Sequence, residues 1–189
     1  PLPCTIRPDN DKTVSNAFEI FEQNKDSAAE YWGFKEVGIP HNEMKKLFSH
    51  MSKCGKKTVL EVVSYTESEC LKGAYQAAEC GCDILMGTLF FNSVNRFCQR
   101  HNIKYMPFIG DVSGRPSVLN GNIKDIIAEA NNYIQQGVYG FDLLGYRYTG
   151  DINKLLTEFV ANIEVPVCIA GSINSYSRLD AVRETSPWA

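Results

Sequence analysis

The stretch KTVLEVVSYTESECLKGAYQAAEC, residues 57–80, contains the structural unit that decides the fold of this 189-residue chain. Its first half is an apolar run rich in β-branched residues, which predicts a buried strand. A polar turn follows, and the second half repeats apolar residues at the spacing of one helix face: Leu71, Ala74, Tyr75 and Ala78. The stretch therefore predicts a strand followed by an amphipathic helix.

The same order of strand and helix recurs along the chain. Seven segments are predicted strands, most of them apolar throughout, as is typical of strands covered on both faces: 3–8, 31–39, 57–65, 83–89, 104–112, 140–146 and 165–173. A helical pattern follows each of them. Strict alternation of this kind predicts an α/β protein with a parallel sheet and right-handed crossovers.

The choice between a barrel and an open sheet depends on nucleotide motifs. The sequence has neither a G-x-G-x-x-G turn after the first strand nor a Walker lysine loop. We therefore expect no cofactor and favour a TIM (β/α)8 barrel over an open sheet. The barrel is predicted to be a single domain over residues 1–189. A closed barrel usually needs at least about 200 residues. Seven βα units are visible, and Trp188-Ala189 resembles the first step of an eighth strand. We expect that strand to be missing from the sequence, either because the end of the native protein is lacking or because segments are omitted.

The composition of the chain argues against two classes of partner, nucleic acids and membranes. Lys and Arg number 19 and Asp and Glu number 22, which gives a formal net charge of −3 without a long run of like charge. A nucleic-acid partner is therefore not expected. No apolar stretch approaches the roughly 20 residues that cross a bilayer, and the N-terminus has no signal-peptide pattern. We expect a cytoplasmic protein with no membrane partner, and a homo-oligomer is left open.

The seven cysteines are predicted to be buried thiols. Their number is odd, and disulfides are rare in a reducing compartment. Cys80 and Cys82 form a close pair, but no second pair follows at zinc-like spacing, and the three histidines are scattered. We predict no metal site.

The most specific candidate site follows the last predicted strand. There an apolar run enters Gly171-Ser172 and then a helix, with Asn174 in the connection. Backbone amides and a helix N-terminus would meet at this point, which is a geometry that binds phosphate. Barrels that handle sugar phosphates commonly bind phosphate after strands seven and eight. The alternative is that Gly171 is only a turn glycine.

Two further candidates follow the fifth and sixth strands. Asp111 at a strand end in a dry barrel mouth would act as a general base, and Arg147 would anchor an anionic substrate or a carbonyl oxygen. In the alternative, Asp111 only caps a loop and Arg147 is solvated. The long connection 113–122 is a candidate lid or, equally, an inert surface insertion.

Charged residues also occur inside predicted strands. Of the adjacent Lys35 and Glu36, strand alternation sends one into the barrel and the other toward the helices. An inward Lys35 could form a Schiff base, and an inward Glu36 or Glu61 could move protons. An inward ion pair that merely fills the barrel bottom is the alternative. Asp142, at the start of its predicted strand, is interpreted as structural.

Three short stretches resemble the N-acetylmannosamine-6-phosphate 2-epimerases, a family of phosphate-binding (β/α)8 barrels. Residues 110–113 resemble the A-D-I-S of that family, 140–145 its G-F-D-I-V-G, and 165–173 its V-P-V-I-A-E-G-R-I. The family relies on a lysine at one strand end and a glutamate in the last motif. The corresponding positions here hold Ser64 and Ala170. The resemblance thus implies the family's phosphate site, at Gly171 and Ser172, without its catalytic pair.

VLEVVSYT, with Glu61, is in turn similar to the keto-deoxy-phosphogluconate aldolases, whose lysine is absent from 140–146, so that a Schiff base would need Lys35. Together the residues predict an enzyme that acts on a sugar phosphate or another small phosphorylated carbonyl compound, either as an isomerase or epimerase or as an aldolase-type lyase. Asp111, Glu61 and Lys35 are the catalytic candidates, and Arg147, Gly171, Ser172 and Asn174 the substrate-binding ones. The alternative is a non-catalytic sensor of a phosphorylated ligand, similar to antiterminator regulators.

Overall fold

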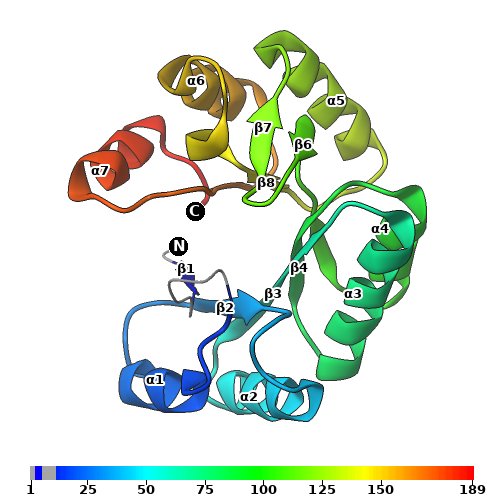
Figure 1. Ribbon diagram of the computed structural model, residues 1–189, viewed down its shortest axis with the longest axis vertical. Helices are drawn as coiled ribbons and strands as arrows, with labels where there is room; N and C mark the ends of the chain where they lie inside the picture. The colour runs from blue at the N-terminus through cyan, green and yellow to red at the C-terminus, as the bar shows by residue number, and fades with distance from the viewer. Residues whose placement is uncertain (1–2, 6–11) are drawn as a thin grey trace. The chain divides into compact units, whose positions relative to one another are not determined.

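The computed structural model describes residues 3–5 and 12–189 of the chain (Figure 1). The chain divides into two compact units, Pro1–Tyr105 and Met106–Ala189. They are called unit 1 and unit 2 below, and each is described by itself.

Unit 1 alternates strands and helices. Its elements are β1 (Pro3–Thr5), α1 (Ala17–Asn24), β2 (Tyr31–Lys35), α2 (His41–Lys53), β3 (Lys57–Ser64), α3 (Glu67–Cys80), β4 (Ile84–Thr88), α4 (Asn92–Arg100) and β5 (Lys104–Met106), whose last residue belongs to unit 2. The strands form one sheet in the order β1-β2-β3-β4-β5. The pairs β1–β2, β2–β3 and β3–β4 are parallel.

The helices of unit 1 cover one face of this sheet. Phe34 of β2 stacks on Phe48 of α2, with 4.2 Å between the ring centroids. On β3, Val62 lies so close to α3 that a Cβ added to Gly73 would meet it at 2.6 Å. Because side chains alternate along a strand, Lys35 and Glu61, the neighbours of Phe34 and Val62, lie on the opposite face. The alternation of side chains along the strands thus places Lys35 and Glu61 on the face that does not contact the helices.

Unit 2 contains an antiparallel hairpin and two further strand–helix repeats. Its elements are β6 (Asp111–Ser113), β7 (Val118–Asn120), α5 (Ile123–Gln135), β8 (Phe141–Leu143), the 3₁₀ helix η1 (Gly145–Arg147), α6 (Ile152–Asn162), β9 (Val167–Ile169) and α7 (Tyr176–Thr185). Strands β6 and β7 pair with each other, and β8 pairs with β9 in parallel. Phe141 of β8 packs edge-on against Phe159 of α6 in the core of the unit.

The end of the chain lies beside β9. Ala189 donates a hydrogen bond to the carbonyl of Val167 (3.2 Å) and accepts one from the amide of Ile169 (2.8 Å). This is the bonding of a parallel neighbour. Trp188-Ala189 therefore lies where the sequence predicted the first step of another strand.

The prediction of a parallel α/β fold is confirmed. Each of the seven predicted strands contains an observed strand, each of the seven predicted helices is present, and residues 6–8 of the first predicted strand lie outside the described residues. The hairpin β6–β7 was not predicted. Within the described residues the strands form one five-stranded and two two-stranded sheets, so a closed barrel is not established, and the single-domain assignment stays a prediction.

None of the six cysteines with a described side chain forms a disulfide. Burial raises the pKa of Cys70 to about 11 and the pKa values of Cys82 and Cys98 to about 12. In the described part of the chain, no His, Cys, Asp or Glu residues gather in a group that could hold a metal ion. No helix there is long and apolar enough to span a membrane.

Candidate functional site

The loop that follows β9 in unit 2 has a backbone that only glycine fits at one position. The Ala170 amide donates to the Leu143 carbonyl (2.7 Å), which holds the strand end against β8. Gly171 then has φ +115°, and a Cβ placed there would lie 3.0 Å from Cβ of Tyr146 and 3.2 Å from its backbone. Gly171 is therefore required by both its dihedral angle and the close approach of Tyr146. The interpretation of Gly171 as a turn glycine therefore describes its backbone geometry correctly.

The same loop presents unbonded amides. Ile173 donates to the Gly171 carbonyl (3.0 Å), but no described residue accepts a hydrogen bond from the amides of Gly171, Ser172 or Asn174. Ser175 caps the following helix, and its hydroxyl accepts from the Arg178 amide at 3.3 Å. Donors of this kind before a helix N-terminus suit an anion such as phosphate.

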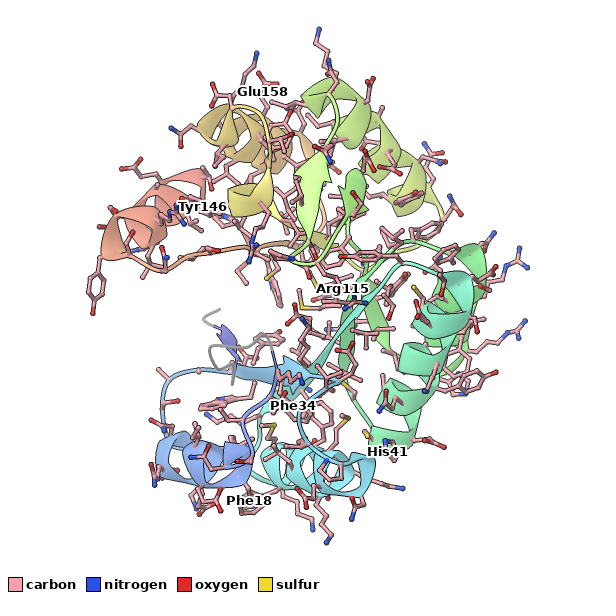
Figure 2. The ribbon with its side chains drawn as sticks, viewed as in Figure 1. Phe18, Phe34, His41, Arg115, Tyr146 and Glu158 are labelled. Carbon is pink, nitrogen blue, oxygen red and sulfur yellow. The ribbon has the colours of Figure 1, made fainter. Side chains whose placement is uncertain are left out.

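Arg178 shapes this loop and was not found from the sequence. Its guanidinium donates to the carbonyl of Ser172 and to Oδ1 of Asn174 (3.3 Å), and it lies 5.0 Å from the ring centroid of Tyr146. Tyr146, labelled in Figure 2, donates its hydroxyl proton to the Arg178 carbonyl (3.1 Å). The signal in the sequence was an arginine three residues after the cap Ser175. A search restricted to strand ends does not find Arg178, because this residue lies on α7 and its side chain extends back to the loop.

Arg147, the predicted anion anchor, is the last residue of η1. It follows Tyr146 directly, and Tyr146 contacts both Gly171 and Arg178. Its side chain is half-buried, and no described residue forms a hydrogen bond or ion pair with it. Arg147 thus belongs to the same part of unit 2 as the Gly171 loop.

Asp111 does not have the predicted surroundings. We expected a buried carboxylate at a strand end, but its side chain is exposed and the residue begins the hairpin strand β6. The cause is a turn at Gly110, where φ is +80° and the amide donates to Oε2 of Glu129 (2.9 Å). This turn directs the chain out of the apolar run that precedes it. The expected dry environment of Asp111 is therefore wrong.

The candidate lid, residues 113–122, contains the turn and the second strand of this hairpin, and its β7 end is hydrogen-bonded to the segment after η1. The amide of Thr149 donates to the Leu119 carbonyl (3.0 Å), and the hydroxyl of Tyr148 donates to the Gly121 carbonyl (2.8 Å). These bonds tie β7 to the segment after η1. The hairpin thus forms part of the packed structure of unit 2.

The second group of candidates lies in unit 1. Lys35 and Glu61 are register partners on the parallel strands β2 and β3, so their side chains share the face of the sheet that the helices leave uncovered. Lys35 is only 3% exposed, and Glu61 is half-buried. The hydroxyl of Thr13 accepts from the Lys35 amide (3.0 Å) and donates to its carbonyl (2.8 Å). The backbone of Lys35 is therefore bonded on the side away from β3.

Glu36 extends this group. Its amide donates to the Glu61 carbonyl (3.0 Å), and its Oε1 accepts from the Val63 amide (3.3 Å). Burial raises the pKa of its carboxyl group; the backbone hydrogen bonds and the charge of Lys35 act against this rise, and the charge of Glu61 adds to it. The end of β2 thus carries an amine and a carboxyl group on consecutive residues.

No protein-family model matches the chain, and no curated protein matches it. Solved structures do. A thiamine phosphate pyrophosphorylase from Pyrococcus furiosus is 13% identical, with a TM-score of 0.64 over 98% of this chain and 80% of that one. A glycerol uptake operon antiterminator regulatory protein from Listeria monocytogenes is 13% identical, with a TM-score of 0.62 over 98% and 94% of the two chains.

A third similar structure is the 2-keto-3-deoxy-6-phosphogluconate aldolase of Zymomonas mobilis, solved with 3-phosphoglycerate. It is 14% identical, with a TM-score of 0.63 over 95% of this chain and 73% of that one. The likeness shows the fold. It is a parallel α/β fold whose neighbours are of the TIM-barrel type. At these identities the neighbours assign no activity to the chain. The likeness to aldolases thus extends to their fold, and the resemblance to the epimerases stays a prediction.

Proposed function

We propose that the chain binds a small phosphorylated carbonyl compound through the Gly171 loop and acts on it as an isomerase, an epimerase or an aldolase-type lyase. The observation that carries the proposal is the row of unbonded amides at Gly171, Ser172 and Asn174 before α7. The N-terminus of a helix carries roughly half a positive charge, which favours an anion at this point. The positive charges of Arg147 and Arg178 in the same part of unit 2 act in the same direction.

The choice of an enzyme rests on unit 1. Lys35 and Glu61 place an amine and a carboxyl group side by side on the face of the sheet opposite to the helices. An amine in such a position can form a Schiff base with a carbonyl group, and a carboxylate can take a proton from the adjacent carbon. Asp111 of unit 2 is exposed, and it stays a catalytic candidate beside Lys35 and Glu61 of unit 1.

The finer description of the fold is also a proposal. We infer a (β/α)8 barrel and a single domain. The alternation of strands and helices supports this, as do likenesses that cover 95% or more of the chain with each of the three structures. A homo-oligomer in the cytoplasm stays part of the proposal.

A sensor of a phosphorylated ligand is the second candidate. The similar structure of the antiterminator regulator supports this candidate, because the match covers 98% of this chain and 94% of the regulator. A sensor and an enzyme would use the same phosphate loop. They differ in the step after binding, because only an enzyme converts the ligand and only an enzyme needs Lys35 and Glu61.

Isothermal titration calorimetry tests the binding step. The probes are inorganic phosphate, 3-phosphoglycerate and dihydroxyacetone phosphate, with unphosphorylated glycerate as the control ligand. We expect the phosphorylated probes to bind and Gly171→Asp to abolish their binding, since the new side chain would collide with Tyr146, deform the loop and add a negative charge to it. The matched control is Gly55→Asp, at another glycine of positive φ (+78°) with open space around it. Equal binding by the wild type and Gly171→Asp would refute the phosphate loop.

Turnover separates the two candidates. Dihydroxyacetone phosphate and aldol partners are incubated with the wild type, Lys35→Met and Glu61→Gln, and products are followed by nuclear magnetic resonance. An enzyme loses at least about 100-fold in rate when a proton-transfer residue is removed. Binding that is intact in all three proteins, with no turnover in any, favours the sensor.

A further inference from the structure

The outer surface of α3 and α4 in unit 1 carries three aromatic rings in contact. Tyr75 of α3 lies 4.5 Å from Phe97 of α4, and Phe97 stacks on His101 with 4.0 Å between the ring centroids. Tyr75 is 57% exposed, Phe97 is half-buried, and His101, directly after α4, is exposed. Neighbouring exposed rings indicate a contact surface more strongly than scattered ones do. These three residues are called the aromatic ladder below.

The helices α3 and α4 lie side by side and run in the same direction (Figure 1). Their N-terminal ends meet where the hydroxyl of Ser93 donates to Oε1 of Glu67, and their middles meet at Tyr75 and Phe97. The strands that precede the two helices, β3 and β4, are parallel as well. Corresponding ends of α3 and α4 therefore lie at the same level.

The two helices carry opposite charge. Helix α3 has three glutamates and one lysine, which gives a formal charge of −2, whereas α4 has two arginines and a charge of +2. All six of these side chains are exposed. Among the described residues, none forms a hydrogen bond or an ion pair with the side chain of Arg96 or Arg100. Glu79 of α3 contacts His41 of α2 at 3.1 Å, and its carboxylate stays exposed to solvent. The surface around the aromatic ladder is thus acidic on one helix and basic on the other.

We propose that a second copy of this chain docks on the aromatic ladder, with a twofold axis in the plane of the contact and parallel to α3 and α4. This axis sets α3 of one protomer opposite α4 of its partner, and the rings pack at the centre. Glu79 lies about one turn beyond Tyr75, and Arg100 about one turn beyond Phe97. Glu79 of each protomer therefore faces Arg100 of the other. An axis across the helices would instead set α3 against α3 and α4 against α4, where like charges repel.

The charges also decide between a second copy and another partner. An acidic peptide would pair with Arg96 and Arg100 but would be repelled by the glutamates of α3 beside them. A second copy complements both helices at once, because the same surface supplies both charges. This contact gives a surface to the homo-oligomer that is part of the proposed function. The dimer needs no ligand, so its failure and the failure of the phosphate loop are separate results.

Sedimentation velocity of the 189-residue chain over a series of concentrations tests the charge pairs. We expect the wild type to dimerise and both Arg100→Glu and Glu79→Arg to associate at least about tenfold more weakly, because each change sets like charges against each other at two symmetric places. The double variant Glu79→Arg/Arg100→Glu should associate like the wild type, and an equimolar mixture of the two single variants should form a heterodimer. Lys46→Glu, at an exposed lysine of α2, is the matched control and should leave association unchanged.

The aromatic ladder is tested in the same assay. Tyr75→Ala should weaken association at least about tenfold, since a tyrosine at the centre of an interface contributes much of its affinity. Phe18→Ala, which removes a ring that is 45% exposed on α1, is the control and should have no effect.

Three results overturn the inference. The first is a wild type that stays monomeric up to its highest soluble concentration, which would leave the ladder to a partner other than a second copy. The second is a dimer that neither Arg100→Glu nor Tyr75→Ala weakens. The third is a failure of both the double variant and the mixture to restore association that the single variants have lost. Circular dichroism of each variant shows whether it keeps its fold.

Discussion

Replacement of Gly171 by alanine tests the geometry of the proposed phosphate loop. The new Cβ would lie 3.0 Å from Cβ of Tyr146 and 3.2 Å from its backbone carbons, and the residue would have to keep φ near +115°. A side chain in so sparsely populated a backbone region costs about 1–3 kcal/mol. Overpacking against a rigid neighbour costs about another 1–3 kcal/mol. Gly171→Ala should therefore lower the free energy of unfolding by about 2–6 kcal/mol, a large part of the 5–15 kcal/mol of a typical protein.

Gly55→Ala is the matched control for this experiment. Gly55 also has positive φ (+78°), but nothing lies within 4 Å of its Cβ position, so only the left-handed backbone costs energy there, about 1–2 kcal/mol. Urea unfolding followed by circular dichroism gives both values. Hydrogen exchange should place the loss of protection in Gly171→Ala around β9 and η1. Equal destabilisation by the two substitutions, or a loss of protection away from Tyr146, would refute the close approach that defines the loop.

Two further predictions concern ionisable groups. Hydrogen bonds from Lys25 at the end of α1 and from His50 of α2 lower the pKa of Glu22, so this carboxylate stabilises the folded state above its ordinary pKa and ceases to do so as the pH falls through the lowered value. The melting temperature should fall on acidification below about pH 5 more steeply in the wild type than in Glu22→Gln, and identical profiles would contradict this. Burial raises the pKa of Cys82 to about 12, so roughly one thiol in 10⁴ should be ionised at pH 8. We therefore expect iodoacetamide to leave Cys82 unlabelled in the native protein. Rapid labelling of Cys82 would contradict its burial.

The order of strands and helices could be predicted from the sequence because it depends on local hydrophobic periodicity. The same is true of the face on which Lys35 and Glu61 lie, since alternation along a strand needs no knowledge of distant residues. The identity of the loop at Gly171 followed from an apolar strand that runs into glycine before a helix. These features are local in the chain, and they agree with the structure.

The remaining features depend on contacts between distant residues. The exposure of Asp111 follows from a turn that Glu129 stabilises from α5. The hairpin β6–β7 is tied down by Thr149, about 30 residues away. Arg178 of α7 extends back across the loop to Ser172 and packs on the ring of Tyr146, which lies about 30 residues earlier in the chain. Neither hydrophobic periodicity nor a motif at a strand end contains this information.

The central claim, an anion site on the backbone of the Gly171 loop, is tested most directly by amide chemical shifts. The ¹⁵N-labelled 189-residue chain is titrated with inorganic phosphate and with 3-phosphoglycerate, and the amide signals are followed. We predict saturable shifts that are largest at Gly171, Ser172 and Asn174 and that are lost in Gly171→Asp. The absence of saturable shifts at these three amides, or shifts that are largest elsewhere in the chain, would contradict the account.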